Sequence, residues 1–291
     1  MSGQDETLLD LVDESEFIYE TEIINDAKLL EIVADDQLVA NVAAGEAQLI
    51  FDRTPFYAEM GGQVGDHGVI KNTAGDIVAE VTDVQHAPNG QNLHFVKVMQ
   101  PLQTGEQYVL ELDHEFRKKV KRNHTATHLL DQALRNTLGE HTHQAGSLVE
   151  PTYLRFDFTS LEALTKEQLQ NVEDLVNEKI YQELNVETVI TDQETGRKMG
   201  AIALFGEKYG DEVRVVNIGD WSIEFCGGTH VKNTSEIGLF KIISESAIGA
   251  GVRRIEAVTS KEAFAYLKEH DLILQGIKNE TKATKVTDIQ D

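Results

Sequence analysis

The sequence of 291 residues has one cysteine, Cys226, and no long apolar run. A lone cysteine cannot form an intramolecular disulfide, so we expect no covalent cross-link and a reducing compartment. No window approaches the ~18 uninterrupted apolar residues of a membrane-spanning helix, and the first six residues have neither the basic nor the apolar region of a signal peptide. These absences predict a soluble, cytoplasmic protein.

Basic side chains are also scarce. The chain has 26 Lys and Arg against 50 Asp and Glu, a formal net charge of −24 at pH 7, which argues against a polyanionic partner. The deficit is uneven, because residues 1–114 carry 4 basic and 22 acidic side chains whereas residues 115–291 carry 22 and 28. The charge argument is therefore weaker for the second part of the chain.

The length and composition are those of a globular protein with two domains. Hydrophobic residues make up 41% and charged residues 26%, which excludes a disordered, collagenous or coiled-coil chain. A chain of 291 residues exceeds the ~100–200 residues of a usual single domain. The change in charge near His114 marks the expected boundary.

Residues 1–113 have the pattern of a small antiparallel β-barrel domain. Short runs rich in β-branched residues recur roughly every ten residues, separated by Gly, Asn, Asp and Pro. The predicted strands are 48–51, 69–70, 77–84, 93–98 and 108–112. The turn sequences at 73–76 and 88–90 predict hairpin connections.

Residues 114–259 predict an α+β domain, and residues 260–291 a C-terminal helix and a polar tail. Apolar residues at spacings of three and four predict a helix over 116–138, which ends near Gly139. A capping box at Thr165–Gln168 predicts a second helix, which runs to about Glu183. The remaining predicted elements are a helix over 261–278 and strands at 155–158, 186–190, 213–218, 239–244 and 255–258.

Two pairs of side chains predict a metal site. His124 and His128 are four residues apart on the first predicted helix, so both imidazoles project from one face about one turn apart. Cys226 and His230 have the same spacing, separated by two glycines that favour a tight loop. Three imidazoles and one thiolate form a donor set that suits one Zn²⁺ ion.

Other interpretations of these residues stay open. The histidines could be surface or core residues with hydrogen-bond partners, and Cys226 a packed apolar residue. A metal could be structural with four protein ligands or catalytic with three. The chain lacks the glutamate after the first histidine that zinc proteases use, and the second cysteine of nucleoside deaminases. Both classes of enzyme are therefore disfavoured.

These motifs together resemble the editing domain of the alanyl-tRNA synthetase family. The first domain carries that family's glycine motif at residues 53–66, RTPFYAEMGGQVGD, with Met60 where many relatives have Gly or Ser. Further matching stretches are 144–147 QAGS, 154–158 LRFDF and 251–257 GVRRIEA. The resemblance covers about residues 15–280. It identifies the second predicted domain as an editing domain with a zinc site.

The resemblance implies hydrolysis of tRNA(Ala) that has been mischarged with serine or glycine. A synthetic pocket sized for alanine excludes glycine weakly, because one missing methyl is worth only ~1–3 kcal/mol, and it rejects an added hydroxyl poorly as well. A second, polar site must then remove the errors. No segment resembles an ATP-dependent aminoacylation domain, so we expect an excised part of the synthetase, with the acceptor end of tRNA(Ala) and the remainder of the synthetase as partners.

The resemblance also suggests polar residues around the metal. Gln144, Thr127 and Thr54 are candidate catalytic residues, and Thr54 is expected to hydrogen-bond the hydroxyl of serine. Gly61, Gly62 and Gln63 are expected to close one wall of the pocket, because glycine lets the backbone approach a ligand. The alternatives are a turn residue for Thr54, a solvated loop residue for Gln144 and an ordinary hairpin turn for the glycines.

Basic residues in the second part of the chain are candidates for contact with tRNA. Five of them start the helix that carries the two histidines, and two more form a second basic pair. They are Arg117, Lys118, Lys119, Lys121, Arg122, Arg253 and Arg254. The alternative is a solvated helix face, but phosphates near the metal would need cations of this kind.

Two other functional classes remain possible. A threonyl-tRNA synthetase editing domain has similar His and Cys pairs, although the glycine motif favours the alanyl family. A zinc-stabilised RNA-binding module would have no hydrolytic activity.

Overall fold

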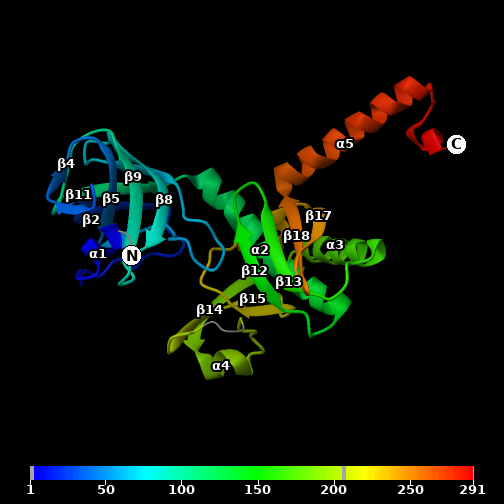
Figure 1. Ribbon diagram of the computed structural model, residues 1–291, viewed down its shortest axis with the longest axis horizontal. Helices are drawn as coiled ribbons and strands as arrows, with labels where there is room; N and C mark the ends of the chain where they lie inside the picture. The colour runs from blue at the N-terminus through cyan, green and yellow to red at the C-terminus, as the bar shows by residue number, and fades with distance from the viewer. Residues whose placement is uncertain (1–2, 205–207, 291) are drawn as a thin grey trace. The chain divides into compact units, whose positions relative to one another are not determined.

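The computed structural model describes residues 3–204 and 208–290 (Figure 1). Contacts between residues divide them into two compact units. The first contains residues 3–124 with 147–151 and 226–229, and the second contains 125–146, 152–204, 208–225 and 230–290. The boundary crosses helix α2 (His114–Leu138) between His124 and Thr125.

The first unit is built around a closed antiparallel barrel. Its ring of six strands runs in the order β11, β7, β8, β9, β5 and β2, and β2 pairs in turn with β11, so that no edge of the ring is left open. The strands are β2 (Ile23–Ala34), β5 (Gly45–Phe51), β7 (Gly68–Lys71), β8 (Ile77–His86), β9 (Asn92–Val98) and β11 (Gln107–Leu112). Leu29, Leu49, Ile70 and Leu110 are among the fully buried residues that fill its core.

Short elements complete the first unit. The strand β3 (Gln37–Val39) continues from β2 as a hairpin, and two small sheets pair β1 with β6 and β4 with β10. Their bounds, with the first helix, are α1 (Gly3–Leu8), β1 (Glu16–Phe17), β4 (Asn41–Val42), β6 (Arg53–Thr54) and β10 (Leu102–Gln103). The strand β6 lies in the predicted glycine motif and carries Thr54.

The second unit has two antiparallel sheets. A four-stranded sheet has the order β12-β13-β18-β17, from β12 (Gln144–Val149), β13 (Leu154–Thr159), β17 (Phe240–Gly249) and β18 (Val252–Thr259). A three-stranded sheet has the order β14-β15-β16, from β14 (Val186–Asp192), β15 (Glu212–Ile218) and β16 (Ser222–Phe225). The strand β16 leads directly into the loop that contains Cys226 and His230.

The second unit also contains helices. The helix α3 buries one stripe, Val172, Val176 and Ile180, and joins β17 through Asn177, whose amide bonds both the N–H and the C=O of Phe240. The helix α5 extends away from the end of β18 (Figure 1). The remaining bounds are α3 (Lys166–Tyr181), α4 (Gln193–Lys198), η1 (Thr234–Ile237), α5 (Ser260–Thr281) and η2 (Val286–Gln290).

The predicted fold class, an antiparallel barrel followed by α+β structure, is confirmed. Both predicted hairpins are present, with Gly75 and Gly90 in the left-handed region at φ 91° and 89°. The capping box is present as well, because Thr165 Oγ1 accepts from the N–H of Gln168, whose side chain accepts from the N–H of Thr165. Within the described ranges, no helix is both long and apolar enough to cross a membrane.

Candidate metal centre

The helix α2 holds the first pair of candidate ligands. Asp113 caps its N-terminus, with its carboxylate accepting from the N–H of Phe116 at 3.1 Å. Arg117, one turn in, is 2% exposed and pairs with Asp66, and it donates to the C=O of Pro55 at 2.9 Å. These contacts fasten the start of the helix to the glycine-motif segment. His124 and His128 follow, both buried at 6% exposure.

The second pair lies in the loop after β16. Cys226 Sγ lies 3.5 Å from Nε2 of His124 and accepts from the N–H of Gly228 at 3.4 Å. The rings of His128 and His230 meet edge to face, with centroids 4.8 Å apart. A Cβ on Gly228 would lie 2.1 Å from the ring of His124 and 2.6 Å from Gln63 Oε1, so only glycine fits at this position.

His124, His128, Cys226 and His230 form one cluster that can hold a metal ion. Each offers one ligand atom, and these four atoms all lie within 4.8 Å of one another. Because metal–nitrogen and metal–sulfur bonds are about 2.0–2.3 Å, small side-chain adjustments would bring all four onto one ion. The three histidines are buried and Cys226 is half-buried. The residues predicted from the two spacings are therefore brought together.

Gln63, predicted as a pocket residue, contacts His124. Its Oε1 accepts from the backbone N–H of Thr229 at 2.9 Å and lies 2.7 Å from Nδ1 of His124, and its Nε2 donates to Thr229 Oγ1 at 2.8 Å. The side chain is fully buried. The turn before it places Gly61 and Gly62 at φ 61° and 88°, with Gly62 packed closely against Ser147.

A buried acidic pair lies beside His128. Glu224 Oε1 is 3.5 Å from His128 Nδ1, and Asp131 pairs with Arg135 at 3.0 Å. Burial and the negative charge of Glu224 raise the pKa of Asp131 well above its ordinary value. Burial alone would raise the pKa of Glu224 too, but His128 lowers it below the ordinary value.

Thr54 has its hydroxyl in a buried hydrogen-bonded chain. His94 Nδ1 donates to the C=O of Leu49 at 2.9 Å, because a carbonyl can only accept. His94 Nε2 is then an acceptor, and it receives the hydroxyl proton of Thr54 at 2.7 Å. Thr54 Oγ1 also accepts from the N–H of Phe56 at 3.0 Å. Burial lowers the pKa of His94 to about 4, so the ring is neutral at pH 7.

The other predicted polar residues lie at different depths. Thr127 is buried on α2 next to His128, and Gln144 is half-buried at the start of β12. The strand β12 continues to Val149, whose backbone N–H and C=O bond Gly62 and Val64 of the glycine-motif loop.

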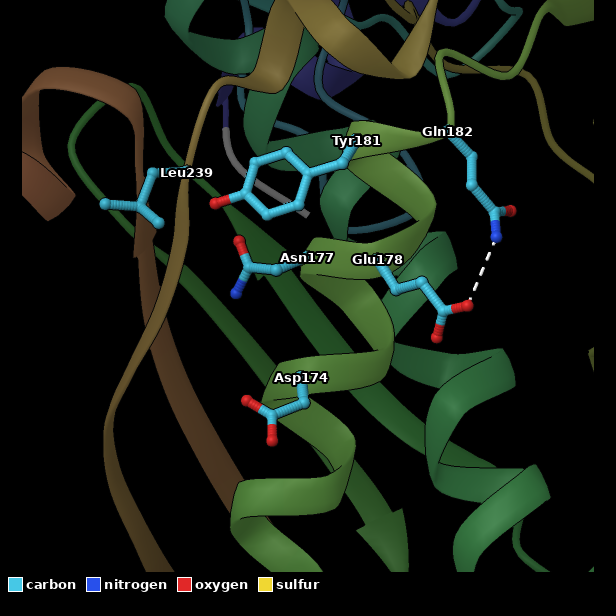
Figure 2. Close-up of a pocket in the computed structure, with 6 residues that line it drawn as sticks. All are labelled: Asp174, Asn177, Glu178, Tyr181, Gln182 and Leu239. Atoms are coloured by element: carbon cyan, nitrogen blue, oxygen red, sulfur yellow. Dashed lines mark hydrogen bonds between the residues drawn. The ribbon is translucent and has the colours of Figure 1, made fainter.

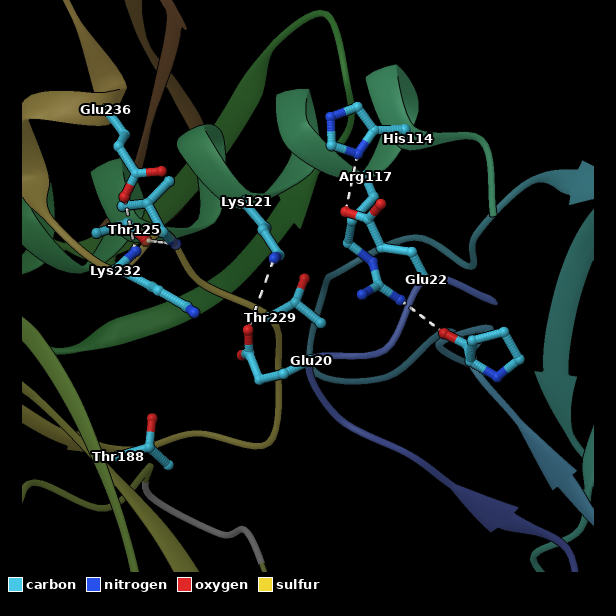
Figure 3. Close-up of polar contacts among 12 residues, drawn as sticks. Glu20, Glu22, His114, Arg117, Lys121, Thr125, Thr188, Thr229, Lys232 and Glu236 are labelled. Atoms are coloured by element: carbon cyan, nitrogen blue, oxygen red, sulfur yellow. Dashed lines mark hydrogen bonds and ion pairs between the residues drawn. The ribbon is translucent and has the colours of Figure 1, made fainter. Parts of the chain in front are cut away.

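The candidate tRNA-binding residues fall into two groups. Arg117 is buried against Asp66, and Arg253 and Arg254 pair with Glu245 and Asp157, so these three guanidinium groups already have carboxylate partners. Lys118 is exposed, and Lys119, Lys121 and Arg122 are half-buried. Figure 3 shows Lys121 beside Glu20, at 3.9 Å, and His114 beside Glu22, at 2.8 Å.

A shallow pocket on α3 contains none of the predicted site residues. It is lined by Asp174, Asn177, Glu178, Tyr181, Gln182 and Leu239 (Figure 2). The amide of Asn177 is already engaged by Phe240, and Gln182 donates to Glu178 at 3.2 Å. The pocket is a surface depression along the helix.

Sequence reasoning missed Thr125, Asp131, His94 and Glu224, which contact predicted site residues or their partners. A buried position on a charged, amphipathic helix is the only signal for Thr125 and Asp131. Glu224 directly precedes the Phe225–His230 motif, and its position two residues before Cys226 is the sequence signal that could have identified it.

Two family models match the chain, and both describe tRNA synthetases. The threonyl and alanyl tRNA synthetase second additional domain matches residues 213–256, which include Glu224 and the loop with Cys226 and His230. The class II (A) tRNA synthetase family matches residues 1–116. Both matches point to the tRNA synthetases as the class of protein that this chain resembles.

The similar proteins are alanine–tRNA ligases. The chain is 61% identical over 289 residues to the alanine–tRNA ligase of Lactobacillus johnsonii, 59% over 290 residues to that of Ligilactobacillus salivarius and 59% over 289 residues to that of Latilactobacillus sakei. Each match covers 99% of this chain and 33% of the ligase. The chain is thus homologous, over nearly its whole length, to about one third of an alanine–tRNA ligase, and the predicted resemblance to alanyl-tRNA synthetase is confirmed.

Proposed function

We propose that this chain hydrolyses the ester bond of tRNA(Ala) mischarged with serine or glycine. The observation that carries the proposal is the cluster of His124, His128, Cys226 and His230, with ligand atoms within 4.8 Å, in a chain 61% identical to an alanine–tRNA ligase. The four residues come from a helix and from the loop within the matched synthetase domain. In this proposal the chain acts as the editing part of the synthetase.

The donor set favours Zn²⁺ as the metal. Three imidazole nitrogens and one thiolate bind Zn²⁺ in preference to Mg²⁺ or Ca²⁺, because the latter two ions select oxygen ligands. A bound zinc ion would supply a Lewis acid that polarises an ester carbonyl or lowers the pKa of water toward ~7. The burial of the three histidines would exclude bulk water from around such an ion, which strengthens electrostatic interactions there.

Thr54 is the proposed residue that recognises serine. Its hydroxyl group donates a hydrogen bond to His94 Nε2, so its oxygen can take part in a further hydrogen bond only as an acceptor. The hydroxyl of a seryl group would then have to be the donor. Alanine has no such donor and would leave the buried oxygen facing a methyl group, which disfavours binding of the correct product.

The remaining predicted residues keep their proposed roles with one exception. We assign Gly61, Gly62 and Gln63 to one wall of the pocket, because Gln63 already contacts His124, and Gln144 and Thr127 to polar positions around the metal. Lys118, Lys119, Lys121 and Arg122 are the proposed contacts for the acceptor-end phosphates, with Arg253 and Arg254 as a second basic pair. Arg117 is left out, because it is buried in its pair with Asp66.

Because the chain spans one third of the ligases it matches, its partners are proposals as well. They are tRNA(Ala) and the rest of the synthetase, in the cytoplasm. The domain limits at residues 113 and 259, which rest on charge and periodicity, are likewise proposed.

The test is deacylation of defined aminoacyl-tRNAs by the purified chain. We expect release of serine from Ser-tRNA(Ala), slower release of alanine from Ala-tRNA(Ala), and reduced discrimination in Thr54→Val, which keeps the shape but removes the acceptor. The conservative Thr54→Ser is the matched control and should retain discrimination. Equal rates on the two substrates would overturn the proposed specificity.

A threonyl-type activity is the second candidate, since the matching domain family includes threonyl synthetases. Faster release of serine from Ser-tRNA(Thr) than from Ser-tRNA(Ala) would favour it. Zinc binding and tRNA binding without any release of amino acid would instead indicate an RNA-binding module.

A further inference from the structure

Gln63 fixes which nitrogen of His124 carries the proton. The backbone N–H of Thr229 can only donate, so the atom of Gln63 that faces it at 2.9 Å must be the oxygen. That same oxygen lies 2.7 Å from His124 Nδ1, which must therefore be the protonated nitrogen. The nitrogen left for a metal is Nε2, and it is the one that lies 3.5 Å from Cys226 Sγ.

Thr125 contacts the corresponding nitrogen of His230. Its Oγ1 accepts from the backbone N–H of Val231 at 3.2 Å and lies 3.0 Å from His230 Nδ1. Both Thr125 and His230 are buried. The Thr125 hydroxyl can either donate to or accept from Nδ1, so this contact does not by itself fix the tautomer. It does occupy Nδ1, which makes Nε2 the nitrogen that can bind a metal.

Glu224 is the charged neighbour of His128. Its Oε1 lies 3.5 Å from Nδ1, which is an ion-pair distance outside hydrogen-bond geometry, and both side chains are less than 10% exposed. Asp131 and Arg135 follow His128 on α2 and pair with each other at 3.0 Å.

We propose that Glu224 is a positioning residue of the metal centre, which holds His128 with Nε2 toward the ion, and that Gln63 and Thr125 hold His124 and His230 in the same manner. The inference rests on the metal centre proposed above. Metal-binding histidines generally need such a partner on the second nitrogen, and its removal lowers metal affinity about 10–100-fold. Each of the three histidines here has a different kind of partner: an amide, a hydroxyl and a carboxylate.

The test is zinc affinity, measured by competition with a chromophoric chelator in the 291-residue chain. We expect Glu224→Gln and Thr125→Val each to raise the dissociation constant for zinc by about 10–100-fold. Thr125→Ser keeps the hydroxyl and should restore the affinity. Glu187→Gln removes an exposed carboxylate from β14 and is the matched control, which should leave the affinity unchanged.

A second readout reports the tautomers directly. Long-range proton–nitrogen correlation spectra of the zinc-loaded chain should show three histidines with the proton on Nδ1. In Glu224→Ala the Nδ1 proton signal of His128 should disappear or broaden while those of His124 and His230 stay. A purely structural role for Glu224 would not change one histidine selectively.

The outcomes separate this inference from the proposed function. Zinc bound with unchanged affinity in Glu224→Gln and Thr125→Val, or a proton on Nε2 of the three histidines, would overturn the positioning roles alone. An unchanged chain that takes up no zinc would overturn the metal centre itself. Loss of folding in Glu224→Gln, judged by the fluorescence of Trp221, would leave Thr125→Val and Thr125→Ser to decide.

Discussion

At the scale of single residues, His94 makes the stability of the barrel depend on pH. Its pKa is about 4 in the folded chain, because of burial, against an ordinary value of 6.5. Above pH 6.5 the ring is neutral in both the folded and the unfolded state, so the stabilisation is fully present. As the pH falls from 6.5 to 4, only the unfolded state takes up the proton, and stability is lost. The difference corresponds to roughly 3 kcal/mol.

Comparison with His94→Gln, which does not titrate, isolates this contribution. We expect hydrogen exchange of the β9 amides to accelerate between pH 7 and 4.5, after correction for the intrinsic rate, more in the unchanged chain than in the variant. Direct titration of His94 by NMR provides a check that does not depend on the variant. A pKa near 6.5 would contradict the burial argument.

Gly228 gives a second prediction at this scale. In Gly228→Ala the new Cβ would lie 2.1 Å from His124 and 2.6 Å from Gln63, which would displace the imidazole from the cluster. Gly227→Ala is the matched control, since the nearest atom to its Cβ is Tyr19 Oη at 3.8 Å, an ordinary contact. We expect Gly228→Ala to lose most of its zinc by metal analysis and Gly227→Ala to keep it. Equal zinc content would show that the loop can shift.

The four candidate ligands could be predicted from the sequence, but their partners could not. A spacing of four residues places His124 and His128 on one helix face, and the lone cysteine stands in a recognisable motif. Glu224, Thr125 and His94 have no such local pattern, because each acts through a residue far away in the sequence. The separations are 96 positions for Glu224–His128, 105 for Thr125–His230 and 40 for His94–Thr54. Pairings of this kind exist only once the chain has folded.

At the scale of elements, the N-cap of α3 gives a prediction about stability. The side chain of Thr165 accepts a hydrogen bond from the backbone N–H of Gln168. Thr165→Ala should therefore lower the free energy of unfolding by about 1 kcal/mol. Thr165→Asn, which can still cap the helix, should retain most of this stabilisation. The single tryptophan, Trp221, lies 4.9 Å from Lys179 of α3, so its fluorescence during urea unfolding reports on this helix. An unfolding midpoint of Thr165→Ala equal to that of the unchanged chain would contradict the capping role.

Elements with a clear period were predicted well, and those without one were missed. The helices α2, α3 and α5 have apolar residues at regular spacing, and their ends agree with the prediction within about three residues. The strand β2 was not predicted, because Asn25, Asp26, Lys28 and Glu31 interrupt its apolar pattern. Its partners β5 and β11 on either side stabilise it as a strand, which a local pattern does not reveal.

At the scale of the whole molecule, a net charge of −24 makes any contact with tRNA depend on local cations. Replacing Lys118, Lys119 and Lys121 together by Gln should weaken binding of Ser-tRNA(Ala) and flatten its salt dependence, by up to ~0.7–0.9 in the logarithmic slope for each lost phosphate contact. Zinc content should stay the same. The exposed Lys198→Gln on α4 is the control. An unchanged slope in the triple variant would contradict a role of these lysines, and Arg253 and Arg254 would then be the candidate tRNA contacts.

The central claim is that the cluster of three histidines and one cysteine is the hydrolytic centre. The most direct test is to remove metal from the chain with a chelator, add zinc back in steps, and measure release of serine from Ser-tRNA(Ala) at each step. The account predicts a rate that rises in proportion to bound zinc and levels off at one ion per chain, with no recovery in Cys226→Ala. Full activity of the metal-free chain, or of Cys226→Ala without zinc, would contradict it.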